Sequence, residues 1–288
     1  MNRFNLNFKP ISDIYTEVNF EHKNIKNDKI RLRVGDSQLE SIRNYSPIAA
    51  DILDLATAIY TADRICKDKL KCISREIHIN LPLRLPQIFQ DSVIINLLDE
   101  LLTWNTGSYW VFSFSKRKTQ LRKAEQILSG IDFFDENSEV ALWSGGLDAL
   151  AGLYGRRREF PNKHFYLVGT GSNKPTIGKQ KKVRNFLSKD LKDKTSLFQI
   201  PILIEGIKSL KKNFYMRSRG VVFALIGSVV AFLQKKNELF IYENGIGAFN
   251  LPYTKAGVGL YHSRSVHPIT LHITSILLSH LFEKRFKV

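Results

Sequence analysis

The expected fold is decided by the stretch Val140-Ala141-Leu142-Trp143-Ser144-Gly145-Gly146-Leu147-Asp148-Ala149-Leu150, near the middle of a chain of 288 residues. A short apolar strand runs into Ser144-Gly145-Gly146, and a helix is predicted to begin directly after it. Glycine permits backbone angles that are closed to other residues, and the N–H groups at the start of a helix bind anions. The stretch therefore predicts a phosphate-binding turn between a strand and a helix. An ordinary tight turn is the alternative interpretation.

The alternation of strand and helix continues along the rest of the sequence. Strands are predicted at 140–143, 164–168, 197–204 and 239–242, and helices at 147–157, 179–191, 217–233 and 269–282. This order is typical of an α/β fold in which helices cover both faces of a parallel sheet. Ligands bind such sheets at the carboxyl ends of the strands, which is where the predicted turn lies.

A smaller region of mixed α/β structure is expected before the acidic stretch at 132–139. Ser46 and Pro47 predict the start of an amphipathic helix that runs to about Ile65. Strands are predicted at 76–81 and 109–114, with a helix at 90–104 between them. We therefore expect an N-terminal accessory domain, residues 1–137, and a nucleotide domain, residues 138–288.

The net charge of +16 belongs almost entirely to the second domain, which has 24 basic and 9 acidic residues against 19 and 18 in the first. This charge makes nucleic acid a candidate partner of the second domain, the alternative being a solvated surface. The longest apolar run, 220–233, is shorter than the ~20 residues of a membrane span, so no membrane partner is expected. The sequence shows no secretory signal and only two cysteines, Cys66 and Cys72, which favours the cytoplasm.

The turn at 144–149 resembles the SGGxDS loop of the PP-loop ATP pyrophosphatases, which cleave ATP between its α and β phosphates. Within that superfamily the chain is similar to the QueC-like proteins (7-cyano-7-deazaguanine synthase-like), and most of all to the QatC type found in Qat anti-phage systems. The similar stretches are 142–155, 217–220 and 240–252, and residues 51–64 resemble the extra domain of the QatC type. The resemblance implies the PP-loop, or adenine nucleotide alpha hydrolase-like, fold.

The resemblance also implies an activity and its cofactors. The expected reaction is ATP-dependent adenylation of a carboxylated deazaguanine, followed by transfer to ammonia or to an amine of a partner protein of a defence operon. ATP and Mg²⁺ are the cofactors implied. The nucleotide-binding residues implied are Ser144, Gly145, Gly146, Leu147, Asp148, Ala149, Thr170 and Gly171. Asp148 and Arg219 are assigned to catalysis, Asp148 also to the metal, and the substrate to Arg217, Arg219, Glu243, Asn244 and Gly245.

Two departures from the family pattern leave alternatives open. Ala149 stands where the family has a serine, and the cysteines that bind structural zinc in QueC-like proteins are absent, so zinc is not expected from this chain. The spacing of His262, His267, His272 and His280 does not suggest a metal site either. A tRNA-modifying PP-loop enzyme and a non-catalytic scaffold of a defence complex are the competing functions. Arg219 could equally be solvated, and residues 243–245 could form an ordinary turn.

Overall fold

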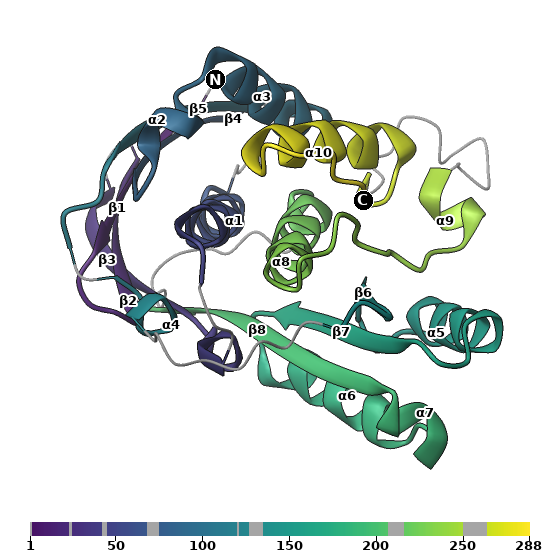
Figure 1. Cartoon of the computed structure of the whole chain (residues 1–288). Helices are drawn as coiled ribbons and strands as arrows, with labels where there is room; N and C mark the ends of the chain where they lie inside the picture. The colour runs from purple at the N-terminus through teal and green to yellow at the C-terminus, as the bar shows by residue number, and fades with distance from the viewer. Residues whose placement is uncertain are drawn as a thin grey trace.

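One sheet of eight strands joins distant parts of the sequence (Figure 1). The computed structural model describes residues 2–22, 25–41, 45–67, 75–119, 121–126, 135–206, 216–249 and 264–288. The strands are β1 (Asn2–Pro10), β2 (Tyr15–His22), β3 (Ile25–Val34), β4 (Arg75–Leu83), β5 (Tyr109–Lys116), β6 (Ser138–Leu142), β7 (His164–Gly171) and β8 (Thr195–Glu205). Their order across the sheet is β5-β4-β1-β2-β3-β8-β7-β6. The α/β class is therefore confirmed, although the sheet is mixed rather than parallel throughout.

The half of the sheet that carries the predicted turn consists of three parallel strands, β8, β7 and β6. Beyond β6, Phe240 adds a short parallel bridge. Its N–H donates to the carbonyl of Val140, and the N–H of Leu142 donates to the carbonyl of Phe240, both at 2.9 Å. The chain thus moves from β6 to β7 and β8, and then returns to the opposite side of β6. Such a reversal leaves a crevice at the carboxyl end of the strand where it occurs. That strand is β6, which leads into Ser144.

Helices cover both faces of this half of the sheet. The helices of the chain are α1 (Pro47–Ile65), α2 (Pro86–Phe89), α3 (Ser92–Thr106), α4 (Lys123–Gln126), α5 (Leu147–Glu159), α6 (Lys174–Asn185), α7 (Lys189–Asp193), α8 (Arg219–Leu233), α9 (Gly245–Phe249) and α10 (Pro268–Leu281), with a 3₁₀ turn, η1, at Ser37–Ser41. On β7, Phe165 and Leu167 belong to the core beneath α5, α6 and α7. Tyr166 and Val168 belong to the core shared with α8 and α1. This alternation is what a strand buried on both faces requires.

The apolar run at 220–233 is the buried helix α8, as predicted. It packs beside α1 and α10, and most of its side chains are inaccessible to solvent (Figure 1). Among the described residues, no helix combines the length and the apolar character needed to cross a bilayer.

The helix α1 has the predicted bounds, but it is not a surface helix. Every residue of α1 except Pro47 and Arg64 is buried, because the sheet curves around it and α8 packs alongside (Figure 1). Its polar side carries Asp51, Asp54 and Asp63, whose carboxylates are bound by arginines from other elements. The polar side of the amphipathic helix is therefore neutralised inside the protein.

The first three strands were not predicted, although they account for much of the sheet. The antiparallel strands β1, β2 and β3 lead to β8, with Arg31 opposite Glu205 and Val34 opposite Ile202. Strands from both sides of residue 137 therefore share one sheet, and α1 packs on α8 across the same division. Independent folding of residues 1–137 and 138–288 stays a prediction.

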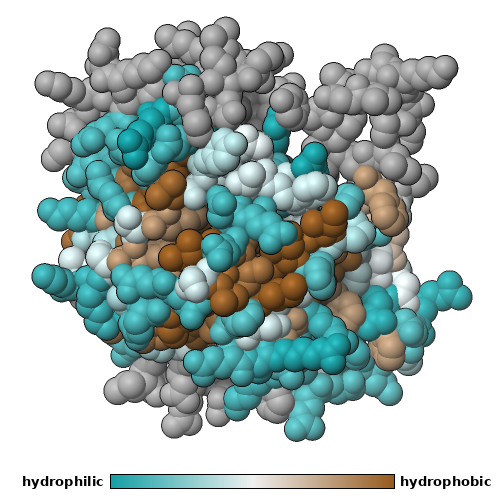
Figure 2. All heavy atoms as spheres, turned by 90° about the horizontal axis from the view of Figure 1, so that it is seen from above, coloured by the Kyte–Doolittle hydropathy of each residue, from teal (hydrophilic) through white to brown (hydrophobic). Residues whose placement is uncertain are grey.

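Other elements differ from their predicted bounds. The single helix expected at 179–191 is two helices, α6 and α7, and the strand expected at 239–242 is reduced to the Phe240 bridge. The predicted positions Cys72 and His262 lie outside the described residues. At the C-terminal end, α10 packs on α3, where the Trp104 indole N–H donates to Thr270 at 3.2 Å. Figure 2 shows the molecule from this side, with apolar side chains in a band between hydrophilic ones.

Candidate functional site

The turn between β6 and α5 has the backbone geometry of an anion-binding loop. Gly145 adopts a φ of +67°, which favours glycine, and the N–H of Gly146 donates to the hydroxyl oxygen of Ser144 at 3.0 Å. Gly146 is the N-cap of α5 and the helix begins at Leu147. N–H groups in the first turn of a helix have no partner within that helix, so they suit an anionic group such as phosphate.

The turn is held in place by Gln180 of α6. The Trp143 indole N–H donates to the carbonyl oxygen of Gln180 at 3.0 Å, and the Gln180 side chain donates to the carbonyl of Thr170 at 2.9 Å. A Cβ atom at Gly145 would lie 3.1 Å from the Gln180 Cα. Gly145 is therefore required both by its backbone angle and by the close approach of α6.

Two carboxylates meet beside the turn through an amide. The side-chain nitrogen of Asn244 donates to Asp148 at 3.3 Å and to Glu243 at 3.1 Å. The structure thus brings together three site residues that were predicted from two separate stretches. In the described ranges, no group of three or more His, Cys, Asp and Glu side chains forms a metal-binding cluster. Mg²⁺ commonly uses one or two carboxylates and takes its other ligands from phosphate and water, so Asp148 and Glu243 fit a Mg²⁺ that arrives with a nucleotide.

A cavity of about 590 Å³ opens at this crevice, within the size range of small-molecule sites. The predicted site residues that line it are Ser144, Ala149, Thr170, Gly171, Arg219 and Glu243. The other predicted residues, Gly145, Gly146, Leu147, Asp148, Arg217, Asn244 and Gly245, are not in its wall. Leu147 is 79% exposed and Gly145 and Gly146 form the turn itself, whereas Ala149 is 5% exposed and lies on the side of α5 that faces the core.

The start of α8 positions one predicted arginine in the cavity and another outside it. The guanidinium of Arg219 lies 4.9 Å from the ring of Phe223, and both residues line the cavity. Arg217 instead donates to the carbonyl of Thr106 at 3.3 Å. Between them, the hydroxyl and N–H of Ser218 both donate to the buried carboxylate of Asp63, at 2.8 and 3.1 Å. The helix that carries Arg219 is therefore anchored to α1.

The sequence analysis missed the contribution of α1 to the cavity. Tyr60 and Arg64 line it, although they precede the Ser-Gly-Gly turn by about 80 residues. Asn173 and Thr176, at the start of α6, also line it, and the Asn173 side chain accepts the N–H of Thr176 at 2.8 Å. The pattern at 173–176 is recognisable as a helix N-cap, but nothing local marks Tyr60 or Arg64 as ligand-facing.

A buried cluster behind the cavity holds its outer wall. The hydroxyl of Tyr242 donates to Glu139 at 2.6 Å, and Arg156 binds the same carboxylate at 2.6 Å. Burial, together with the hydrogen bond to Glu139, raises the pKa of Tyr242 above its ordinary value. On the other side of Tyr242, a Cβ atom at Gly152 would lie 2.3 Å from the Tyr242 Cβ. The segment that carries Glu243 and Asn244 is thus fixed between β6 and α5.

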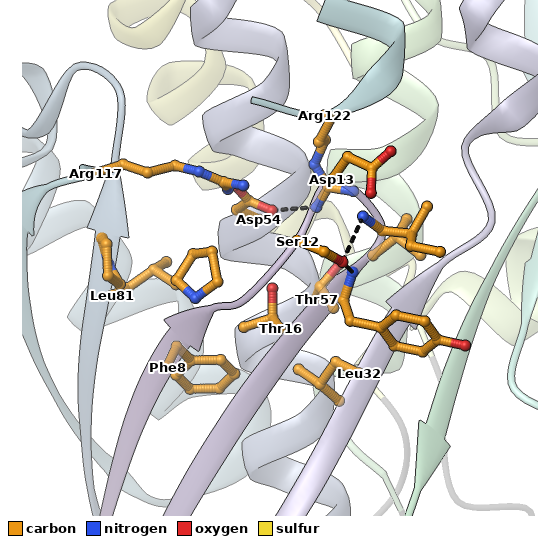
Figure 3. A pocket seen from close by; sticks show the side chains of 15 residues that line it. Phe8, Ser12, Asp13, Thr16, Leu32, Asp54, Thr57, Leu81, Arg117 and Arg122 are labelled. Carbon is orange, nitrogen blue, oxygen red and sulfur yellow. Dashed lines mark hydrogen bonds and ion pairs between the residues drawn. The ribbon is translucent and has the colours of Figure 1, made fainter. Parts of the chain in front are cut away.

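A second cavity lies in the N-terminal half, but it is too small for a ligand. Its volume is about 20 Å³, enough for about one water molecule. In its wall, Arg117 and Arg122 converge on Asp54, as Figure 3 shows, and Arg84 reaches the same carboxylate. Burial alone would raise the pKa of Asp54, but Arg122, Arg84 and Arg117 together lower it well below its usual range. We interpret this cluster as structural.

Of the histidines and cysteines named from the sequence, the described ones do not line the cavity. His267 caps α10 by accepting the N–H of Ile269 at 3.2 Å, and His272 and His280 lie on the same helix. Cys66 is buried, which raises the pKa of its thiol. Comparison of the chain with protein-family models, with curated proteins and with solved structures gave no match.

Proposed function

We propose that the chain is a PP-loop enzyme that uses ATP to adenylate a carboxylated deazaguanine, with release of pyrophosphate, in the cytoplasm. The activated acyl group then passes to ammonia or to an amine of a partner protein in anti-phage defence. The substrate and the biological setting are supported by the resemblance of residues 142–155, 217–220 and 240–252 to the QueC-like proteins.

One structural observation carries the proposal. The Ser144–Gly146 turn coincides with the point where the strand order reverses, and the 590 Å³ cavity at that point contains Arg219 and Glu243. Nucleotides bind open α/β sheets at such reversals, because the adjacent loops separate there. A turn formed only to connect a strand to a helix would need neither the cavity nor the converging charged residues.

The chemistry follows from where these groups lie. A carboxylate oxygen of the substrate attacks the α-phosphorus, the bond to the bridging oxygen breaks, and pyrophosphate leaves. The amine then attacks the acyl carbon, the bond between that carbon and the phosphate-bound oxygen breaks, AMP leaves with this oxygen, and the amine releases a proton. The turn would hold phosphate oxygens, Arg219 would bind a carboxylate or phosphate, and Asp148 and Glu243 would hold Mg²⁺. Because Ala149 has no hydroxyl, the phosphate contacts fall to Ser144 and to backbone N–H groups.

The test is formation of AMP and pyrophosphate from ATP, Mg²⁺ and 7-carboxy-7-deazaguanine, with ammonia or co-expressed partner proteins as acceptor. We expect Asp148→Asn to lower the rate by about 100-fold or more, because it removes a charge that orients the metal and phosphates. Asp190→Asn is the control, since this exposed carboxylate pairs with Arg157. Arg157 lies at the C-terminal end of α5, whereas the turn precedes the N-terminal end of that helix.

Two results would contradict the proposal. The first is the absence of AMP with every deazaguanine acid tried when the partner proteins are present. The second is phage protection by Asp148→Asn equal to that of the wild type, which would favour the non-catalytic scaffold. A tRNA-modifying PP-loop enzyme is the second candidate, favoured by the basic charge of residues 138–288.

A further inference from the structure

The charged side chains on the outward face of α6 are all basic. Its inward side consists of Thr176, Ile177, Gln180 and Val183, which are buried or half-buried. The four lysines of the helix, Lys174, Lys179, Lys181 and Lys182, are all exposed, and the helix contains no acidic residue. We call these four lysines the α6 basic face.

The α6 basic face is not neutralised by any carboxylate of the described residues. Within the part of the chain that the structure describes, no carboxylate forms an ion pair with any of the four lysines. The arginines of α5 nearby are different, because Arg156 binds Glu139 and Glu159, and Arg157 binds Asp190. Four clustered positive charges repel one another unless an external polyanion approaches them.

An exposed aromatic residue lies at the end of the same face. Phe186 follows the last residue of α6 and its side chain is 78% exposed, next to the helical turn that carries Lys182. A ring with this exposure is accessible to a planar partner. Lysines along a backbone track, combined with an aromatic ring on which an unpaired base stacks, are the combination found in proteins that bind single strands.

We propose that the α6 basic face and Phe186 bind single-stranded nucleic acid. The lysines contact consecutive phosphates along the helix, and one base stacks on Phe186. At the other end of α6, the N-cap residue Asn173 lies in the wall of the cavity, so a bound strand runs from the mouth of that cavity along the helix. The proposal does not depend on the reaction proposed above.

An anionic membrane is the less suitable partner. A helix that lies on a bilayer inserts a continuous apolar side between the lipids. The apolar side of α6 is instead occupied by the protein core, and between Lys174 and Phe186 the only exposed large apolar side chain is that of Phe186. A polyanion that needs only charge and one stacking surface matches the face better.

Binding of a fluorescein-labelled 20-nucleotide single-stranded RNA, measured by anisotropy between 50 and 200 mM salt, tests the proposal. Four phosphate contacts give a slope of log K against log salt of about −2.8 for a single strand, so affinity should fall about 50-fold over this range. Replacing Lys174, Lys179, Lys181 and Lys182 by glutamine should abolish most of this slope. Phe186→Ala should weaken binding about 5- to 160-fold at constant salt.

The control variant changes the same amount of charge elsewhere. Lys9, Lys118, Arg285 and Lys287 are exposed basic residues outside α6, and their replacement by glutamine should leave the slope unchanged. The proposal is overturned if the control variant loses as much of the salt slope as the α6 variant, or if the wild type does not bind RNA. Binding of the wild type and the control variant to phosphatidylserine vesicles but not to RNA also overturns it. If the fourfold lysine variant is unstable, the single variant Lys181→Gln is used, and it should reduce the salt slope by about a quarter.

The test of RNA binding can be distinguished from the test of the proposed enzyme activity. ATP binding is measured on the same fourfold variant, and it should be unchanged, because the Ser144–Gly146 turn is formed by other residues. Loss of RNA binding with ATP binding intact supports the α6 basic face alone. Loss of ATP binding in Asp148→Asn with RNA binding intact concerns the cavity alone.

Discussion

At the scale of single residues, two glycines of α5 occupy opposite environments. Gly152 lies against Tyr242, where an added Cβ would approach the tyrosine to 2.3 Å, whereas nothing lies within 4 Å of the position that a Cβ would take at Gly155. Alanine is a better helix former than glycine by about 1 kcal/mol. The two positions therefore separate helix propensity from packing on the wall of the cavity.

We predict that Gly152→Ala lowers the free energy of unfolding by about 1–3 kcal/mol, because the methyl group has to displace a tyrosine held by Glu139. The same change should weaken nucleotide binding, since Glu243 and Asn244 follow Tyr242 directly. Gly155→Ala should be neutral or stabilise the protein by up to about 1 kcal/mol. The free energies of unfolding of both variants are measured by urea denaturation. Equal changes in the two variants would contradict the packing described at Tyr242.

At the scale of elements, the buried charges on α1 explain why this helix tolerates full burial. Asp54 is bound by Arg84, Arg117 and Arg122, which come from the end of β4 and from the segments around α4. Removing one partner of such a group leaves the others buried and unbalanced, which typically costs about 3–5 kcal/mol. We predict this loss for Asp54→Asn at pH 7, measured by urea denaturation.

The pH dependence of this loss has a defined sign. The folded-state pKa of Asp54 is lowered, so its stabilising contribution is complete above the ordinary carboxylate pKa of about 4 and disappears as the pH falls below it. The stability difference between wild type and Asp54→Asn should therefore shrink on acidification. Glu159→Gln, which breaks the largely exposed pair with Arg156, should cost less than about 1 kcal/mol and serves as the control.

The sequence predicted those elements whose signals are local. Pro47 and the spacing of apolar residues defined α1, and the paired glycines located the turn before Leu147. The pairing of β3 with β8 could not be predicted, because it depends on residues such as Val34 and Ile202 that meet only in the folded chain. The alternation of Phe4, Leu6 and Phe8 was a readable signal for β1 that went unused.

At the scale of the whole molecule, the candidate site combines groups from both halves of the chain. Asp148, Glu243 and Arg219 follow from motifs in residues 138–288, and the structure places them around one crevice. Tyr60 and Arg64 come from α1 and were not foreseen, since their position depends on the packing of α1 against α8. The cavity wall thus includes residues that no local pattern identifies.

We predict that Arg64→Gln raises the KM for the carboxylated substrate by about 10- to 100-fold, the range expected for loss of a charged hydrogen bond. The dissociation constant for ATP should stay unchanged, because the turn proposed to hold the phosphates is formed by Ser144–Gly146 against α6 and not by Arg64. Arg158→Gln, an exposed arginine at the end of α5, is the matched control. An equal weakening of ATP and substrate would show that Arg64 acts on the fold rather than on the acid.

The contact between Asp63 and Ser218 has a consequence for how such a protein can change in evolution. It fixes the helix that carries Arg219 to a carboxylate more than 150 residues earlier, while β3 supplies the neighbour that β8 needs. Neither half can be exchanged for that of another protein as a module, because each brings part of the same wall and part of the same sheet. Recombination at the acidic stretch, 132–139, would have to preserve the contact between Asp63 and Ser218 and the pairing of β3 with β8 together. The two halves are therefore expected to be inherited together.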